Sequence, residues 1–133
     1  MPLPPAFDER PFAVQIVGAI VVPVIFGLLT GFVLGWSEVL YLLMVGPIGI
    51  AGGFLGGIEH RRADEGLLRG AIGGLVFGSF ILIGLEIMNT EPKAHLGDPQ
   101  AGLAVVTTLG GAILGAAGGH WRMRQERRVA LGG

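Results

Sequence analysis

The sequence has no cysteine, and this absence excludes disulfide bonds, thiolate catalysis and cysteine-ligated metal sites. Charged residues are also scarce, at 14% of the 133 residues, and the nine basic residues nearly cancel the ten acidic ones. Because the formal net charge is only -1, the chain has no overall charge with which to hold nucleic acid, and we expect no nucleic-acid partner.

Recognised signatures of catalysis and metal binding are missing too. There is no Gly-x-Ser-x-Gly elbow, no Walker phosphate loop and no paired buried carboxylates, so we expect neither enzymatic activity nor a cofactor. The histidine and acidic side chains near the ends of the apolar runs lack a ligand spacing such as His-Glu-x-x-His. We interpret them as interfacial and surface residues and expect no metal site: Glu59, His60, Asp64, Glu65 and His120 in one group, and Glu91, His95 and Asp98 in the other.

What the sequence has in abundance is apolar length, with 51% apolar residues and a mean hydropathy of +0.68. A run of about 20 apolar residues crosses a hydrocarbon core of about 30 Å as a helix. Four such runs occur, at 13–35, 39–58, 67–88 and 101–121. We therefore predict an all-α integral membrane protein, a single domain of four transmembrane helices followed by a basic tail at 122–133. The first run is too long for a secretory signal and lacks a small-residue cleavage site, so we expect it to be retained.

The arginines fall on one side of these four runs. Because the number of spans is even, the N-terminus, the joint at 58–67 and the C-terminus lie on the same side of the membrane. Arg69 lies just inside the third span, near that side. The opposite side has only Lys93. Because basic residues stay on the cytoplasmic side, we predict cytoplasmic termini in the cell (inner) membrane. We expect contact with lipid or a partner from Arg61, Arg62, Arg122, Arg124, Arg127 and Arg128.

Glycine is unusually frequent for helices, with 25 copies, although each costs up to about 1 kcal/mol relative to alanine in a soluble helix. Many lie four residues apart, which forms a side-chain-free stripe along which membrane helices approach closely. We predict glycine-zipper packing at Gly27, Gly31, Gly35, Gly52, Gly56, Gly70, Gly74, Gly78, Gly111, Gly115 and Gly119. The stripes fit either one monomeric bundle or contacts between chains.

Two segments hint at an internal repeat. "GGIEHRR" from Gly56 and "GGHWRMR" from Gly118 end the second and fourth runs alike, and "GAIVVPVIFG" resembles "GAIGGLVFG" in the first and third. The pattern predicts two parallel helical hairpins. His60 and His120 then lie at the water boundary, with a shared proton or metal site as the alternative interpretation.

The centres of the four runs lack ionisable residues, which disfavours a proton-coupled carrier. Pro23 and Pro47 fall near the midplane, where they free the carbonyls of Ala19 and Leu43. A midplane site would combine Pro23 and Pro47 with Thr107 and Thr108. We expect a structural or accessory subunit, in a homo-oligomer or a larger membrane complex, with lipid around it. The alternative is a small oligomeric channel or carrier with a site near Pro23 and Pro47.

Overall fold

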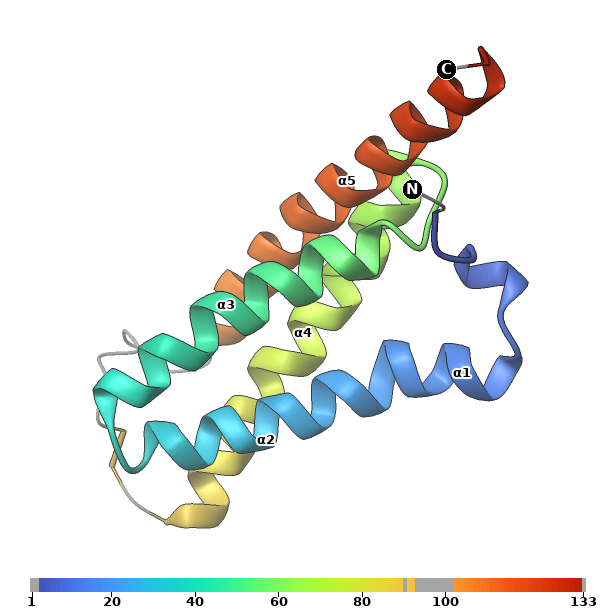
Figure 1. Ribbon diagram of the computed structural model, residues 1–133. Coiled ribbons are helices and arrows are strands. Elements are labelled where there is room, and N and C mark those ends of the chain that lie inside the picture. Colours follow the sequence, from blue (N-terminus) through green and yellow to red (C-terminus); the bar gives the residue numbers. More distant parts are fainter. Residues whose placement is uncertain (1–2, 90, 93–101, 133) are drawn as a thin grey trace.

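The computed structural model describes residues 3–89, 91–92 and 102–132. This part of the chain is helical and contains no strand, and four of its helices are long and apolar enough to cross a membrane. The arrangement is therefore that of a multi-pass membrane protein (Figure 1). Its elements are η1 (Phe7–Glu9), α1 (Phe12–Ile16), the π-helical η2 (Val17–Val21), α2 (Val22–Leu34), α3 (Glu38–Gly57), α4 (Ala63–Met88) and α5 (Gly102–Ala130).

The helix ends follow local chemistry. Ser37 caps α3, its hydroxyl accepting a hydrogen bond from the Leu40 amide at 3.3 Å. Asp64 and Glu65 lie in the first turn of α4, where carboxylates favour a helix start, so α4 begins ahead of the predicted apolar run. Asn89 ends it in the left-handed conformation, with φ 53°. The polar tail after 121 continues α5 as a helix to Ala130.

The first span is one continuous helix with a change of register in its middle. It runs from Phe12 to Leu34 through α1, η2 and α2. In η2 the Val22 amide donates to the carbonyl of Val17, five residues earlier, instead of the usual four. Pro23 follows immediately and has no amide hydrogen to continue the ladder.

α4 lies at the centre of the packing, with α5 on one side and α2 on another. Against α5 the approach is backbone to backbone: a Cβ atom added to Gly66 would collide with the Gly115 carbonyl, and one on Gly70 with the Gly111 carbonyl. Against α2, a Cβ atom on Gly27 would lie 2.7 Å from the Phe77 carbonyl oxygen. Glycine is therefore required at these positions for the observed helix separations.

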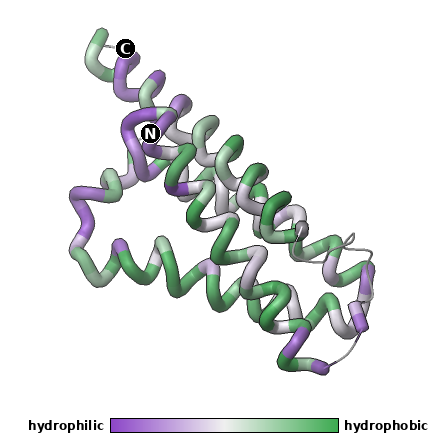
Figure 2. The backbone as a smooth tube through the Cα atoms, turned by 180° about the vertical axis from the view of Figure 1, so that it is seen from behind, coloured by the Kyte–Doolittle hydropathy of each residue, from purple (hydrophilic) through white to green (hydrophobic). Residues whose placement is uncertain are grey.

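The buried apolar cluster is small and lies at one end. Its members come from the end of α2, the start of α3, the second half of α4 and the start of α5: Leu34, Tyr41, Phe77, Ile81, Leu85 and Leu103. Most other large apolar side chains point outward, as Ile113 does with 70% of its surface exposed. Such a surface suits lipid as the surrounding solvent. Figure 2 shows hydrophobic residues along the helices and hydrophilic ones gathered near their ends.

Candidate site at the basic end

The end opposite the apolar cluster, called the basic end here, combines residues 3–11, the α3–α4 joint at 58–62, the first turns of α4 and the last turns of α5. Backbone bonds fix the N-terminal segment to the joint, since the Phe7 amide donates to the Glu59 carbonyl at 2.7 Å. The Arg122 guanidinium donates to the carbonyls of Pro4 and Ile58, both at 2.8 Å. Segments far apart in sequence therefore form one polar layer.

The arginines of this layer differ in what they contact. Arg122 is only 4% exposed and also bonds Glu126 at 2.9 Å, so its guanidinium serves the chain itself instead of facing lipid or a partner. Arg61 pairs with Asp8 and Glu9.

Arg62 pairs with Asp64 at 3.1 Å. On the last turns of α5, Arg124, Arg127 and Arg128 are exposed and form no ion pair with any residue in the described ranges. These three remain the arginines best placed for lipid or a partner.

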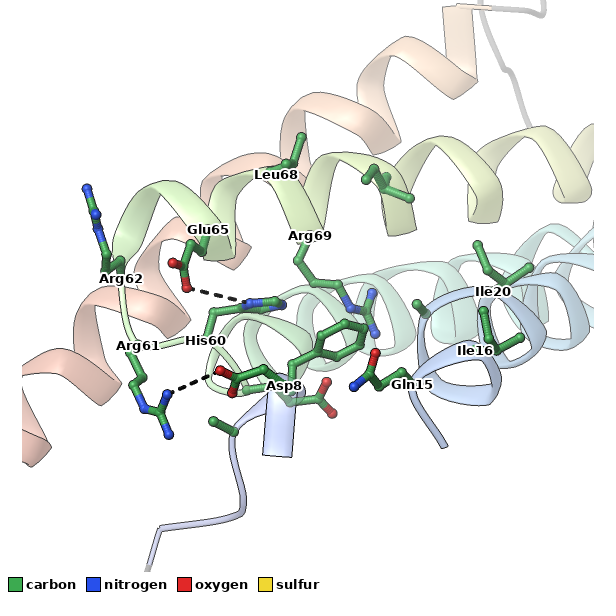
Figure 3. Close-up of a pocket in the computed structure, with 15 residues that line it drawn as sticks. Asp8, Gln15, Ile16, Ile20, His60, Arg61, Arg62, Glu65, Leu68 and Arg69 are labelled. Atoms are coloured by element: carbon green, nitrogen blue, oxygen red, sulfur yellow. Dashed lines mark hydrogen bonds and ion pairs between the residues drawn. The ribbon is translucent and has the colours of Figure 1, made fainter. Parts of the chain in front are cut away.

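Between the N-terminal segment, the first helix, the joint and α4 lies a cavity of about 790 Å³. Its polar wall includes His60, Glu65 and Arg69 (Figure 3). Its apolar wall is aliphatic and consists of Ile16, Ile20, Leu68 and Ile72. In the close-up, Arg69 reaches from α4 toward the first helix, with His60 to one side and Ile16 and Ile20 to the other.

Arg69 is held by groups that the π-helical turn makes available. Its Nη2 donates to the Gly18 carbonyl at 2.9 Å. Gly18 is five residues before Pro23, so in the π register its carbonyl faces a residue with no amide hydrogen. From the sequence, Pro23 is expected to free the Ala19 carbonyl; the carbonyl that Arg69 contacts is that of Gly18, one residue earlier.

Glycines also make room for the guanidinium. A Cβ atom on Gly73 would lie 3.3 Å from Nη1 of Arg69, and one on Gly56 would lie 3.6 Å from Cζ. The guanidinium lies over the Phe7 ring, 5.9 Å from its centroid, in cation–π geometry. Its Nε is buried and has no hydrogen-bond partner within the described part of the chain.

His60 lies beside this guanidinium, on the joint. Its ring stacks on Phe7 with centroids 5.1 Å apart, and its Nδ1 is 3.9 Å from a Glu65 carboxylate oxygen. Burial lowers the pKa of His60, and the Arg69 charge lowers it further, against the opposing effect of the carboxylates of Glu65, Glu59 and Asp8. Nε2 of His60 is buried and, among the residues described, unpartnered.

The two matched histidines of the sequence are not equivalent in space. His60 packs into the polar layer, whereas His120 is exposed on α5. No group of three or more potential metal ligands occurs within residues 3–89, 91–92 and 102–132. His95 and Asp98, from the second candidate metal set, lie outside the described residues, as does Lys93.

The residues predicted near the midplane do not line this cavity. The Thr107 hydroxyl lies 2.7 Å from the Gly74 carbonyl oxygen of α4 and 3.1 Å from that of Ala104. Thr108 donates to Ala104 at 2.6 Å. Both hydroxyls therefore satisfy helix carbonyls. Pro47 lies inside α3, and Pro23 begins α2 after the π turn.

Arg69 and Phe7 are the residues that sequence reasoning left without a role. Arg69 was visible as a charge just inside an apolar run, which is itself a signal of a functional position. Phe7 carried no signal, because its contacts with His60 and Arg69 come from segments more than fifty residues away. Comparison of the chain with protein-family models, with curated proteins and with solved structures finds no match.

Proposed function

We propose that the chain is a structural membrane subunit that assembles with further copies of itself through glycine-mediated helix packing. The observation that carries the proposal is a glycine face on α3 that meets nothing in the described part of the chain. Gly46, Gly49 and Gly52 each have no heavy atom within 4 Å of an added Cβ. In lipid, which offers no hydrophobic drive for helix association, such a face allows the close approach of another helix.

The glycine stripes of α4 and α5 are engaged with each other, although Gly110 of α5 is also open. Gly70, Gly74 and Gly78 face α5, and we interpret the α4–α5 contact as a glycine zipper within one chain. Gly52 is a predicted packing glycine whose added Cβ would meet no described atom within 4 Å. Contacts between chains are therefore better assigned to α3 than to the stripes of α4 and α5.

We further propose that the basic end lies in the cytoplasm and that the chain resides in the cell (inner) membrane. The basic end contains the arginines, and positively charged residues are retained on the cytoplasmic side during insertion. Trp121, 39% exposed at this end, suits the headgroup region, where aromatic belts form. A reporter fused to the C-terminus should be active on the cytoplasmic side; protection of that reporter on the outer face would reverse the orientation.

The alternative function, a small channel or carrier, is less well supported. A channel needs polar groups that face the solute, but three threonine hydroxyls inside the spans donate to helix carbonyls instead. They belong to Thr30, Thr107 and Thr108. Protein-dependent flux of an ion or solute in liposomes would favour the channel over the structural subunit.

The assembly proposal is tested by the mass of the gently solubilised particle. We expect a homo-oligomer for the unaltered chain and a monomer for the variants Gly49→Leu and Gly52→Leu, whose helical content should stay unchanged because an added Cβ there meets no described atom within 4 Å. Val106→Leu, on the exposed surface of α5, is the matched control and should keep the oligomer. A monomeric unaltered chain, or a particle containing a larger foreign partner, would contradict self-assembly.

A further inference from the structure

Two residues that line the cavity at the basic end each have a buried nitrogen atom without a partner among the described residues. The atoms are Nε of Arg69 and Nε2 of His60, from α4 and from the joint before it. Buried polar atoms in folded proteins are nearly always hydrogen-bonded, because leaving one unsatisfied is costly. Nδ1 of His60 is 3.9 Å from Glu65, too far for a hydrogen bond, so no bond prevents the tautomer with its hydrogen on Nε2. A small rotation of either side chain would let its nitrogen donate to an acceptor in the cavity.

The cavity wall includes the carboxylates of Asp8, Glu59 and Glu65 as well as arginines, and Arg69 is the guanidinium that favours an anionic acceptor. The neighbouring guanidinium groups have carboxylate partners: Arg10 with Glu59, Arg61 with Asp8 and Arg62 with Asp64. The Arg69 guanidinium instead contacts a carbonyl and an aromatic ring, and no carboxylate lies within ion-pairing distance of it among the described residues. Arginine stays charged and offers a planar set of donors that suits phosphate oxygens.

One part of the wall is aliphatic and belongs to helices that can cross a membrane. Ile16 and Ile20 come from the first helix, and Leu68 and Ile72 from α4. All four side chains are substantially exposed, with Leu68 at 61%. The first helix diverges from α4 toward the basic end (Figure 1), which leaves this aliphatic wall open.

A polar head and an aliphatic wall in one cavity match an amphiphile. We propose that the cavity binds one anionic phospholipid of the leaflet at the basic end, with its phosphate on Arg69 and His60 and an acyl chain against Ile16, Ile20, Leu68 and Ile72. A volume of about 790 Å³ is within the usual range for ligand pockets. A free phosphate ion would use the nitrogens alone and would leave the aliphatic wall without a role. This site is independent of the glycine face on α3.

Native mass spectrometry of the full-length protein in detergent tests the site. The probes are phosphatidylglycerol and phosphatidylcholine with identical acyl chains. The unaltered protein should retain phosphatidylglycerol about tenfold better, as expected for charge-assisted hydrogen bonds to a lipid whose phosphate is not neutralised by choline. Arg69→Gln should abolish that preference. Arg124→Gln, which removes an exposed arginine outside the cavity, should preserve it.

A second variant tests the acyl-chain wall with the guanidinium intact. Ile72→Trp fills the aliphatic part of the cavity from an exposed position and should also reduce phosphatidylglycerol retention about tenfold. Excess inorganic phosphate should displace no lipid. The same spectra give the oligomer mass, so loss of lipid binding and loss of self-assembly are distinguished.

Three results would overturn the lipid site. They are equal retention by the Arg69→Gln and Arg124→Gln proteins, equal retention of the two lipids by the unaltered protein, and displacement of the lipid by inorganic phosphate. If Arg69→Gln fails to fold, full retention by Ile72→Trp would be enough to reject the site.

Discussion

The two sides of α4 contact their neighbouring helices in different ways, one through glycines and the other through a long side chain. Toward α5, glycines at Gly66, Gly70 and Gly74 bring two backbones into contact over the first half of the helix. Toward the first helix at the basic end, a long arginine side chain spans the space and ends on the Gly18 carbonyl. Small residues therefore produce a dry interface between helices, whereas Arg69 produces a polar cavity within the same bundle.

The two interfaces of α4 differ because only the one with α5 excludes lipid and water. Backbone contact leaves no volume for lipid or water, and its dispersion contacts accumulate along the helix. An arginine between helices must keep its donors satisfied, so it requires carbonyls, rings or bound anions around it. The π turn before Pro23 supplies one such carbonyl, which ties a local defect of the first helix to the position of a side chain on α4.

The largest effect should come from adding a methyl group to the α4–α5 interface. In Gly111→Ala the new Cβ collides with the Gly70 carbonyl, and we expect a loss of about 1–3 kcal/mol of unfolding free energy in detergent. Gly74→Leu and Gly115→Leu should lower stability further, because their backbone contacts are equally close and leucine is larger.

The matched control is the adjacent Gly110→Ala on the same helix, whose Cβ meets nothing within 4 Å. It should be neutral or stabilising by up to about 1 kcal/mol, since alanine favours helix over glycine. Equal destabilisation by Gly110→Ala and Gly111→Ala would show that the two sides of α5 do not differ as described.

A smaller effect is expected on the loosely packed side. Arg69→Met removes the bond to Gly18 and should raise amide hydrogen exchange of residues 12–21 about tenfold, as the loss of one hydrogen bond to a charged group predicts. Exchange in the α5 segment 108–119 should not change. Faster exchange across all helices would instead mean that Arg69 supports the whole bundle.

The smallest effect should be the pH dependence contributed by His60. Its pKa is lowered in the folded protein, so the unfolded chain binds more protons below about pH 6.5. Stability should therefore fall as the pH decreases through about 6.5 and level off below the folded-state pKa. Asp8, Glu59, Glu65 and Arg69 surround the imidazole and set the size of the change.

Thermal midpoints measured in detergent between about pH 5 and 8 test this. His60→Asn should flatten the slope in that range relative to the unaltered protein. His120→Asn, on an exposed position, is the control and should leave the slope unchanged. Identical slopes for all three proteins would show that His60 does not contribute to the pH dependence of stability.

The sequence was sufficient to predict the helices, because four apolar runs of membrane-spanning length leave few alternatives. It was not sufficient to predict which glycines meet which helix, since stripes with similar spacing occur in every run. An added Cβ on Gly52 meets no described atom within 4 Å, although the spacing of Gly52 to Gly56 is the same as that of Gly70 to Gly74. The difference depends on helix positions that only the tertiary structure provides.

The cavity was still less predictable. An arginine near a helix end usually extends toward water, and nothing local in the sequence indicates that Arg69 turns inward. Its direction depends on space at Gly56 and Gly73 and on the carbonyl of Gly18, from three different segments. The contact of Arg69 with the Gly18 carbonyl also depends on the π register before Pro23, which proline alone does not specify.

The central claim is that copies of the chain meet through the open glycine face of α3. Because the chain contains no cysteine, a single Gly49→Cys substitution introduces the only thiol. Oxidation in the native membrane should give a disulfide-linked dimer for Gly49→Cys and none for Ile113→Cys on the exposed surface of α5. Absence of a dimer with Gly49→Cys, or equal cross-linking at both positions, would contradict the claim.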